Sequence, residues 1–477
     1  MIKNFKWVVL VSLTFMACTN DDTVTTGEAP VTAGTADFSK YVALGDSFAA
    51  GFSDGALFKK GQENSYPNLL AQQFAAAGGG VFSSPFMAAD NVGGFSAGGV
   101  QVVSPRLYLD TATNTPTPVT GVSANTLTER LTGSFNNMGI PGAKSFHLLF
   151  NGYAPLNPYF KRMASSLTAT VLGDALAQNP TFFSLWIGGN DALGYSLNGG
   201  VPTSQDAVNG NDLTPTATFT ASYNALATQL SASGRKGVVA NLPYVTALPY
   251  FTTVPFNAVP LNAATATQLN SGYAQYNGGL ALAQNAGLIT AAERTRRTIT
   301  FAEGQNAVVM VDSYLTNLSA LGLPSFRQAT SADLLVLPSR SIIGTAVGGN
   351  PAQVNGVSVP LEDKWVLSSD EIVEVKAATD AYNLVIQAAA TANNLAFVDA
   401  KTVMDQLSTT GLNFNTYNMT STYVTGGSFS LDGFHPSARG YALITNLFID
   451  AINAKYGSTL KKKDGRDFEI LYPRVIN

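Results

Sequence analysis

The stretch YVALGDSFAAG, residues 41–51, passes from four mostly apolar residues directly into Gly-Asp-Ser and then into small residues. An unbroken apolar run of this length is typical of a strand covered on both faces, as in a parallel sheet between layers of helices. Ligands bind at the carboxyl edge of such a sheet, because strand ends and helix N-termini converge there. The sequence therefore places Ser47 at a candidate functional edge.

Three further apolar runs repeat this pattern and run into Gly, Pro or Asp: FFSLWIGG (182–189), KGVVANLP (236–243) and LAFVDA (395–400). Helical patterns lie between and after them. Ser368 with Glu371 forms a capping box, and apolar residues at helical spacing follow Ser437 as far as a stop at Gly457. Alternating strands and helices predict an α/β fold, a three-layer α/β/α sandwich with a central parallel sheet.

Composition restricts the classes of partner. The chain has 477 residues, of which 45% are hydrophobic and 12% charged, so it is apolar enough to bury a large core. The net charge is −4, and the basic residues form no long block beyond Lys461–Lys463, which argues against nucleic-acid binding. Two histidines and one cysteine form no cluster of metal ligands, so we expect neither a metal nor another cofactor.

The first residues, MIKNFKWVVLVSLTFMAC, combine two early lysines with an apolar run of about a dozen residues, which is typical of an export signal and too short for a stable membrane span. Cys18 is the only cysteine and has no partner for an intramolecular disulfide. The stretch resembles a bacterial lipoprotein signal, although a residue smaller than Phe15 is usual in that pattern. The resemblance implies an exported protein anchored by a lipid on Cys18 in the bacterial cell envelope, at the outer membrane. An ordinary secretory signal or an unmodified thiol is the alternative.

Composition also suggests the domain organisation. We expect a signal peptide over residues 1–17 and a lipidated cysteine with a flexible, Thr- and Gly-rich tether over residues 18–37. Residues 38–477 are expected to form one domain. Stretches rich in Gly, Thr, Ser, Asn and Pro predict long insertions in it near residues 76–130, 196–220 and 286–366.

A serine hydroxyl is a poor nucleophile at neutral pH and requires a base within hydrogen-bond reach, usually a histidine. His435 lies in LDGFHPSARG, with Asp432 three residues before it, and a carboxylate so placed can hold the imidazole in the required tautomer. Ser47, His435 and Asp432 are therefore a candidate triad. The other histidine, His147, sits among apolar residues without an acidic neighbour, and we expect it to be a packed structural residue.

Four short blocks together resemble the GDSL, or SGNH, hydrolase superfamily in the family's order: GDSFAAG, NNMGIPGAK, GGND and DGFH. The resemblance implies the SGNH fold and a serine esterase or lipase that cleaves carboxylic esters through an acyl-enzyme. It implies that Ser47 is the nucleophile, His435 the base and Asp432 the residue that orients it. The oxyanion hole would comprise the N–H of Ser47, the N–H of Gly142 and the side-chain amide of Asn190.

Other interpretations stay open. Each block alone is compatible with a simple turn or helix cap. The α/β-hydrolase elbow Gly-x-Ser-x-Gly fits less well, because Ala49 stands where its second glycine belongs. A catalytically silent lipoprotein that binds a glycan or a lipid is the alternative to an enzyme. Among enzymes, the substrate is a lipid, a short-chain ester, an acetylated glycan or a thioester, because the fold does not select it. The apolar stretch at residues 242–256 is expected either to line an acyl channel or to pack against the body.

Overall fold

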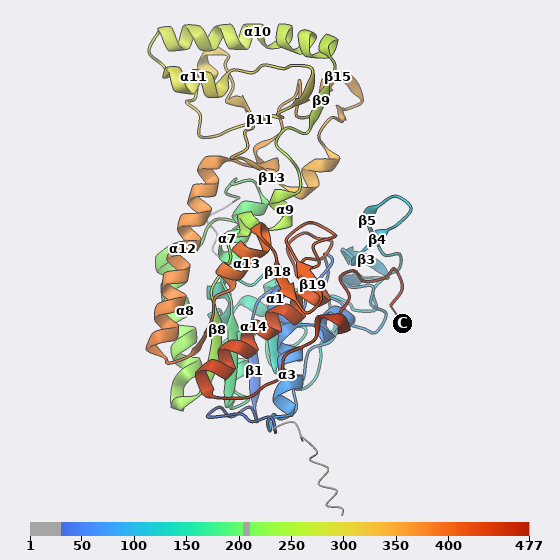
Figure 1. Cartoon of the computed structure of the whole chain (residues 1–477), viewed down its shortest axis with the longest axis vertical. Coiled ribbons are helices and arrows are strands. Elements are labelled where there is room, and N and C mark those ends of the chain that lie inside the picture. Colours follow the sequence, from blue (N-terminus) through green and yellow to red (C-terminus); the bar gives the residue numbers. More distant parts are fainter. Residues whose placement is uncertain (1–29, 204–209, 477) are drawn as a thin grey trace, which may run out of the picture.

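The computed structural model describes residues 30–203 and 210–476 (Figure 1). Its centre is a five-stranded sheet in the order β6-β1-β7-β8-β17, in which every neighbouring pair is parallel. The strands are β1 (Tyr41–Gly45), β6 (Asn137–Gly139), β7 (Phe182–Trp186), β8 (Lys236–Ala240) and β17 (Ala396–Val398). All four strands expected from apolar runs are present. The fifth, β6, is three residues long and too short to show a periodic pattern.

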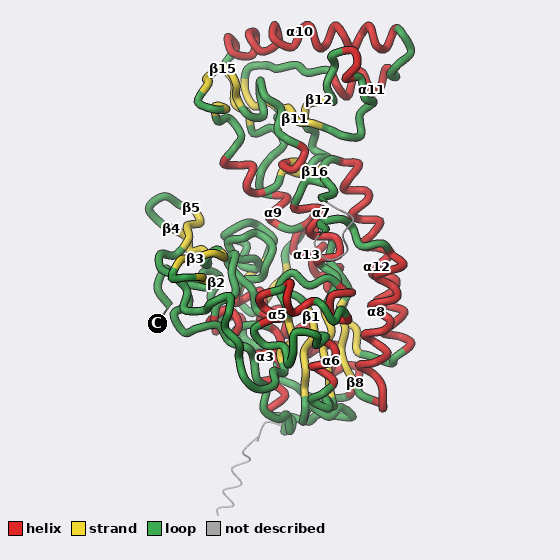
Figure 2. Tube along the Cα trace, turned by 180° about the vertical axis from the view of Figure 1, so that it is seen from behind, coloured by secondary structure: helices red, strands yellow, loops and turns green. Residues whose placement is uncertain are grey.

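Helices cover both faces of the sheet (Figures 1 and 2). One face carries α3 (Tyr66–Ala75) and α14 (Ala438–Tyr456), and the other carries α6 (Val171–Leu176), α8 (Thr216–Ser231) and α12 (Ser369–Ala392). The predicted capping box is present at the start of α12, and Gly457 ends α14 in the left-handed conformation. The three-layer sandwich predicted from the sequence is therefore confirmed.

The sheet is buried between these layers. All five residues of β1 are buried, and Val42, Ala43 and Leu44 are 0% exposed. All five residues of β7 are buried as well, and its pairing with β1 places Trp186 beside Gly45. Continuous apolar runs are thus required along both strands, because each face of the sheet is covered by helices.

A cap with apolar cores of its own projects from one end of the sandwich (Figure 1). It contains residues 286–366, expected as an insertion, together with the preceding segment from Val254 that includes the long helix α10. Its strands form antiparallel pairs of two strands each. Its elements are β9 (Val259–Leu261), α10 (Ala263–Asn285), α11 (Ala291–Arg297), β10 (Gly304–Asn306), β11 (Val309–Val311), β12 (Phe326–Gln328), β13 (Leu334–Leu335), β14 (Ala346–Val347), β15 (Asn350–Val354) and β16 (Val366–Leu367).

A buried ion network joins the cap to α12. The Arg327 guanidinium contacts both carboxylate oxygens of Asp333 at 2.7 Å, and its Nε donates to Asp312 over 2.5 Å. Asp333 also accepts from the backbone N–H of Ser369, the first residue of α12, over 2.9 Å. Because these groups are almost fully buried, the network satisfies charges that water does not reach.

The remaining elements are short. They are the helices α1 (Ser47–Ala50), α2 (Lys59–Glu63), α4 (Tyr153–Leu156), α5 (Pro158–Lys161), α7 (Asn190–Leu197), α9 (Pro249–Thr252) and α13 (Ala400–Thr409), and the hairpins formed by β2 (Phe95–Ala97) with β3 (Val100–Val103), β4 (Leu107–Asp110) with β5 (Thr115–Pro118), and β18 (Leu412–Phe414) with β19 (Tyr417–Met419).

The expected signal peptide and Cys18 lie outside the described residues, so both stay predictions. Among the helices that the structure describes, none combines the length and apolarity needed to cross a bilayer.

Candidate active site

Three of the predicted site residues follow three adjacent strands. Ser47 comes after β1, Gly142 after β6 and Asn190 after β7, and these strands lie side by side in parallel register. Gly45 of β1 pairs with Gly139 of β6, and a Cβ on Gly139 would lie 2.3 Å from the Ala50 nitrogen. Glycine at 139 thus allows helix α1 to lie directly against β6.

Ser47 is the first residue of the short helix α1. Asp46 caps this helix, since its carboxylate accepts from the N–H of Phe48 over 3.0 Å. Ser47 is 7% exposed, and its hydroxyl makes no hydrogen bond within residues 30–203 and 210–476. The serine hydroxyl is therefore available for another partner. Burial raises the pKa of the neighbouring Asp46 carboxyl to about 7, against the opposing effect of the Phe48 N–H.

Asp432 and His435 form the predicted pair. The Asp432 Oδ2 lies 2.9 Å from the His435 Nδ1, and Oδ1 accepts from the His435 backbone N–H over 2.8 Å. Burial alone would raise the pKa of Asp432, but His435 and the backbone donors lower it below its ordinary value. The other ring nitrogen, Nε2, is buried and has no hydrogen-bond partner among the described residues. An ionised carboxylate thus holds the imidazole with one nitrogen free.

The loop after α1 holds the Asp432 segment in place. The Gly55 N–H donates to Asp432 Oδ2 over 2.8 Å, and the Asp54 N–H donates to Ser430 Oγ over 2.9 Å. The Asp54 carboxylate accepts from the Leu431 N–H over 2.9 Å. Asp54 is 1% exposed and adopts a left-handed φ of 51°, which aspartate tolerates better than most residues.

The sequence analysis did not identify Asp54, although it lies seven residues after Ser47. An Asp-Gly pair is typical of an ordinary turn, and no local pattern indicates that this one contacts a segment 377 residues away. Through this loop, the segment that carries Ser47 is hydrogen-bonded to the segment that carries His435. The Phe48 ring, next to Ser47, lies 5.6 Å from the His435 ring.

Gly142 lies on the loop after β6, and Asn190 is the first residue of α7, which follows the neighbouring strand β7. Gly142 is exposed and has a φ of 80°, and a Cβ built on it would meet nothing within 4 Å, so the space beside it is open. The Asn190 Nδ2 donates to the Ala143 carbonyl over 3.0 Å. A primary amide has two N–H donors, so this bond leaves one for a ligand.

Asp191 joins the start of α7 to the segment that follows Gly142. Its carboxylate accepts from the backbone N–H and from the hydroxyl of Ser145, both over 2.8 Å. Burial raises the pKa of Asp191 to about 6, partly offset by these bonds. Asp191 therefore sets the position of Asn190 relative to the Gly142 loop, a role that its place in the GGND block did not reveal.

His147 lies on a different element from the Asp432–His435 pair. It is 3% exposed in the 3-10 helix Ser145–Leu149, its Nδ1 accepts from the Lys144 N–H over 2.9 Å, and its ring stacks on Tyr153 with centroids 4.4 Å apart. These contacts are those of a packed structural residue. In the described part of the chain, no three or more His, Cys, Asp or Glu side chains gather as a metal site would require.

A parallel α/β sandwich, with Ser47, Gly142 and Asn190 after β1, β6 and β7 and an Asp–His pair before the last helix, is a hydrolase-type fold. The chain belongs to the family described as GDSL-like lipase/acylhydrolase, whose model matches residues 41–317. The match includes Ser47, Gly142 and Asn190, whereas Asp432 and His435 lie beyond it. Family membership supports an ester hydrolase.

Comparison with solved structures returns an acetyl-xylooligosaccharide esterase from Geobacillus Stearmophilus, with a TM-score of 0.33, 10% identity, and coverage of 90% of this chain and 99% of that chain. An extracellular lipase from Streptomyces rimosus has a TM-score of 0.29 and 15% identity over 87% of this chain and 98% of that chain. No curated protein sequence matches the chain.

Proposed function

We propose that the protein is a serine hydrolase that cleaves carboxylic esters through an acyl-enzyme. The observation that carries the proposal is the Asp432–His435 pair, with its free Nε2, on a segment hydrogen-bonded to the loop that follows Ser47. In this family, the nucleophile is the serine of the first block.

The proposed reaction has two halves. Ser47 Oγ attacks the ester carbonyl while His435 Nε2 takes its proton, and Asp432 stabilises the imidazolium that forms. When the tetrahedral intermediate collapses, the bond to the alcohol breaks, and the alcohol takes the proton from His435. Water then attacks the acyl-Ser47 ester in the same way and releases the acid.

The negative charge on the carbonyl oxygen requires donors. The N–H of Ser47, the N–H of Gly142 and the second amide N–H of Asn190 would supply them from the three adjacent strand ends. Donors placed in advance at the developing charge are usually the largest catalytic contribution, since they need no reorganisation during the reaction.

The test is hydrolysis of p-nitrophenyl esters from acetate to palmitate by the full chain in mild detergent, with Ser47→Ala beside it. The exposed cap residue Ser331, changed to Ala, is the matched control. We expect wild type and Ser331→Ala to cleave an ester and Ser47→Ala to be inactive with an unchanged melting temperature. Activity retained by Ser47→Ala would contradict the mechanism. Binding of lipid or glycan without turnover would indicate a silent binding protein instead.

We also propose that the protein is exported and anchored by a lipid on Cys18. The support is the apolar signal-like stretch that ends in Ala17 and the sole cysteine. Cys18→Ala should move the protein from the membrane fraction to the soluble fraction of the native host, whereas an unchanged distribution would contradict lipidation.

A further inference from the structure

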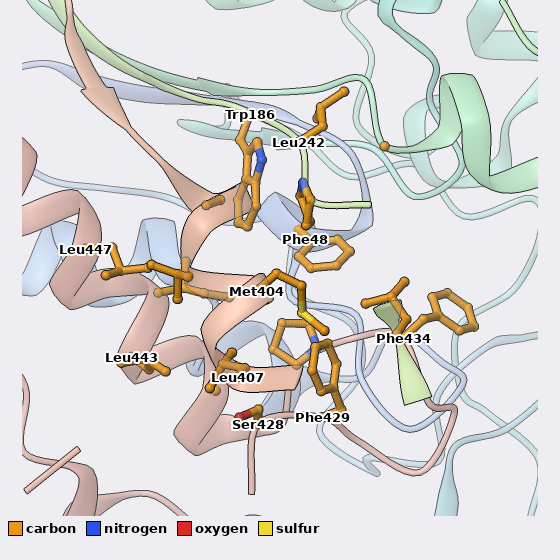
Figure 3. Close-up of a pocket in the computed structure, with 18 of the residues that line it drawn as sticks. Phe48, Trp186, Leu242, Met404, Leu407, Ser428, Phe429, Phe434, Leu443 and Leu447 are labelled. Carbon is orange, nitrogen blue, oxygen red and sulfur yellow. The ribbon is translucent and has the colours of Figure 1, made fainter. Parts of the chain in front are cut away.

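An apolar pocket lies between the carboxyl ends of four central strands and the helices α13 and α14 (Figure 3). Its cavity volume is about 100 Å³, which is comparable to the apolar cavities that hold a single small apolar group. Trp186, Met404, Phe429 and Leu447 are among the labelled residues around it. Of the side chains that line it, only Asp46 and Ser428 carry a polar group other than the Trp186 N–H, which donates to the Asn241 carbonyl.

This pocket directly adjoins the candidate catalytic residues. Its wall contains both chain neighbours of Ser47, namely Asp46 and Phe48, and both chain neighbours of His435, namely Phe434 and Pro436. Gly189, which precedes Asn190, also lines it. The pocket therefore lies beside the segments that carry Ser47 and His435, although neither of these two residues lines it.

Two aromatic rings form the boundary between the pocket and the catalytic imidazole. The Phe48 ring lies between Trp186 and His435, with centroid distances of 5.2 Å and 5.6 Å. The Phe434 ring lies 4.3 Å from the His435 ring. Because these rings present apolar surface on the side of the pocket, nothing there would compensate a buried hydroxyl or charge.

The opposite wall is made of apolar side chains from three segments. Leu242, Val245 and Leu248 come from the segment after β8, which the sequence predicted either to line an acyl channel or to pack against the body. These three residues line the pocket, whereas Phe251 of the same segment packs in the core and is 0% exposed. Met404 and Leu407 of α13 complete the wall near Phe429 (Figure 3).

The polar hydroxyl of Ser428 does not convert the pocket into a polar site. Its Oγ is buried and has no hydrogen-bond partner among the described groups. A glycan would need several donors and acceptors here, and the wall offers one hydroxyl and one buried carboxylate. An alkyl chain needs none.

We propose that this pocket binds the acyl chain of the ester, so that the preferred substrates are esters of medium-chain fatty acids and not acetates. The inference rests on the proposed function. Each additional methylene that enters the pocket should raise kcat/KM about fourfold, until the chain fills the available space.

The first experiment measures kcat/KM for p-nitrophenyl acetate, butyrate, hexanoate, octanoate and decanoate. We expect a rise from acetate to octanoate in the wild type. In Met404→Trp, whose larger ring fills the pocket, the octanoate-to-acetate ratio should fall at least tenfold. Met310→Ala is the matched control for Met404→Ala, because Met310 is equally buried but lies in the cap core. Met404→Ala should extend the optimum to longer chains, while Met310→Ala should leave the ratio unchanged.

The ratio is insensitive to the amount of folded enzyme, so partial unfolding of a variant does not affect the result. A wild type that prefers acetate, or a ratio unchanged in both Met404 variants, would overturn the proposal.

A binding measurement separates failure of the pocket from failure of the function. Decanoate is titrated by calorimetry into Ser47→Ala and into Ser47→Ala with Met404→Trp, below the concentration at which decanoate forms micelles. Binding to the first and at least tenfold weaker binding to the second supports the pocket even where the wild type cleaves no ester. Absence of decanoate binding to Ser47→Ala overturns the pocket even where esters are cleaved.

Discussion

Gly55 donates its backbone N–H to the Asp432 oxygen, Oδ2, that also lies against the imidazole of His435. The two hydrogen bonds are 2.8 Å and 2.9 Å long, and the first joins a loop near the N-terminal end of the body to one near its C-terminal end. The orientation of His435, the proposed base, therefore depends on the segment that immediately follows Ser47, the proposed nucleophile.

Asp54 should be a positioning residue for this arrangement. Asp54→Ala removes the acceptor of the Leu431 N–H and places alanine at a left-handed φ, so we expect kcat to fall about 10-fold to 100-fold with little change in KM. Asp54→Asn retains an acceptor oxygen and tolerates that φ, so it should keep most of the activity. Steady-state kinetics of both variants checks this, and equal losses would show that the charge matters more than the geometry.

His435→Ala should reduce kcat by about 10²-fold to 10⁴-fold, because the serine proton loses its acceptor. Asp432→Asn should be milder, since the amide oxygen still accepts from the N–H groups of Phe434 and His435. Single-turnover rates with the best ester would measure both. Comparable losses would indicate that the charge of Asp432 is as essential as the imidazole itself.

Asn190→Ala should lower kcat about 10²-fold to 10³-fold, the usual effect of losing one donor to the oxyanion. Asn190→Asp keeps the size of the side chain but lacks both N–H donors, so it should be at least as impaired. The Asn190 Nδ2 also bonds to Ala143, so circular dichroism of each variant provides the control for the fold. Retained activity in Asn190→Asp would exclude the amide as an oxyanion donor.

Asp46 should make stability depend on pH. Its folded-state pKa of about 7 lies above the ordinary aspartate value, so between about pH 4 and pH 7 the folded state binds more protons than the unfolded state. This contribution to stability is complete at low pH and is lost as pH rises, with a slope of up to about 1.4 kcal/mol per pH unit. Asp46→Asn preserves an acceptor for the Phe48 N–H and should remove that part of the slope, which denaturant unfolding between pH 5 and pH 8 would show.

Arg327→Ala should destabilise the cap. It leaves Asp333 buried without its cation and Asp312 paired with Arg296 alone, at a cost of about 3 to 5 kcal/mol. Arg296→Ala is the control, because Arg296 also contacts Asp312 but is 35% exposed and should cost much less. Limited proteolysis would detect the difference as preferential cleavage in residues 254–367 of Arg327→Ala, and identical patterns would contradict the role of the network.

Local patterns determine much of this fold. Four strands are visible as continuous apolar runs because both faces of the sheet are buried, and the ends of α12 and α14 are visible in Ser368, Glu371 and Gly457 because caps are local interactions. Ser47 and Asn190 could be placed at strand ends for the same reason, whereas Gly142 was assigned only through the family resemblance. β6 escaped this reasoning, since a three-residue strand has no period. The insertion at residues 286–366 was predicted from composition, but its apolar core and the part of the cap before it were not, since that core joins segments far apart in the chain.

The sequence by itself determined the parallel α/β class and selected Ser47, Asp432 and His435 as candidates, because strand periodicity, helix caps and an Asp-x-x-His spacing are properties of neighbouring residues. Only the tertiary structure showed that Asp54 and Gly55 hold the Asp432 segment and that neighbours of Ser47 and His435 line one apolar pocket. Contacts across 377 residues arise from the packing of loops around the sheet, and no local pattern encodes them.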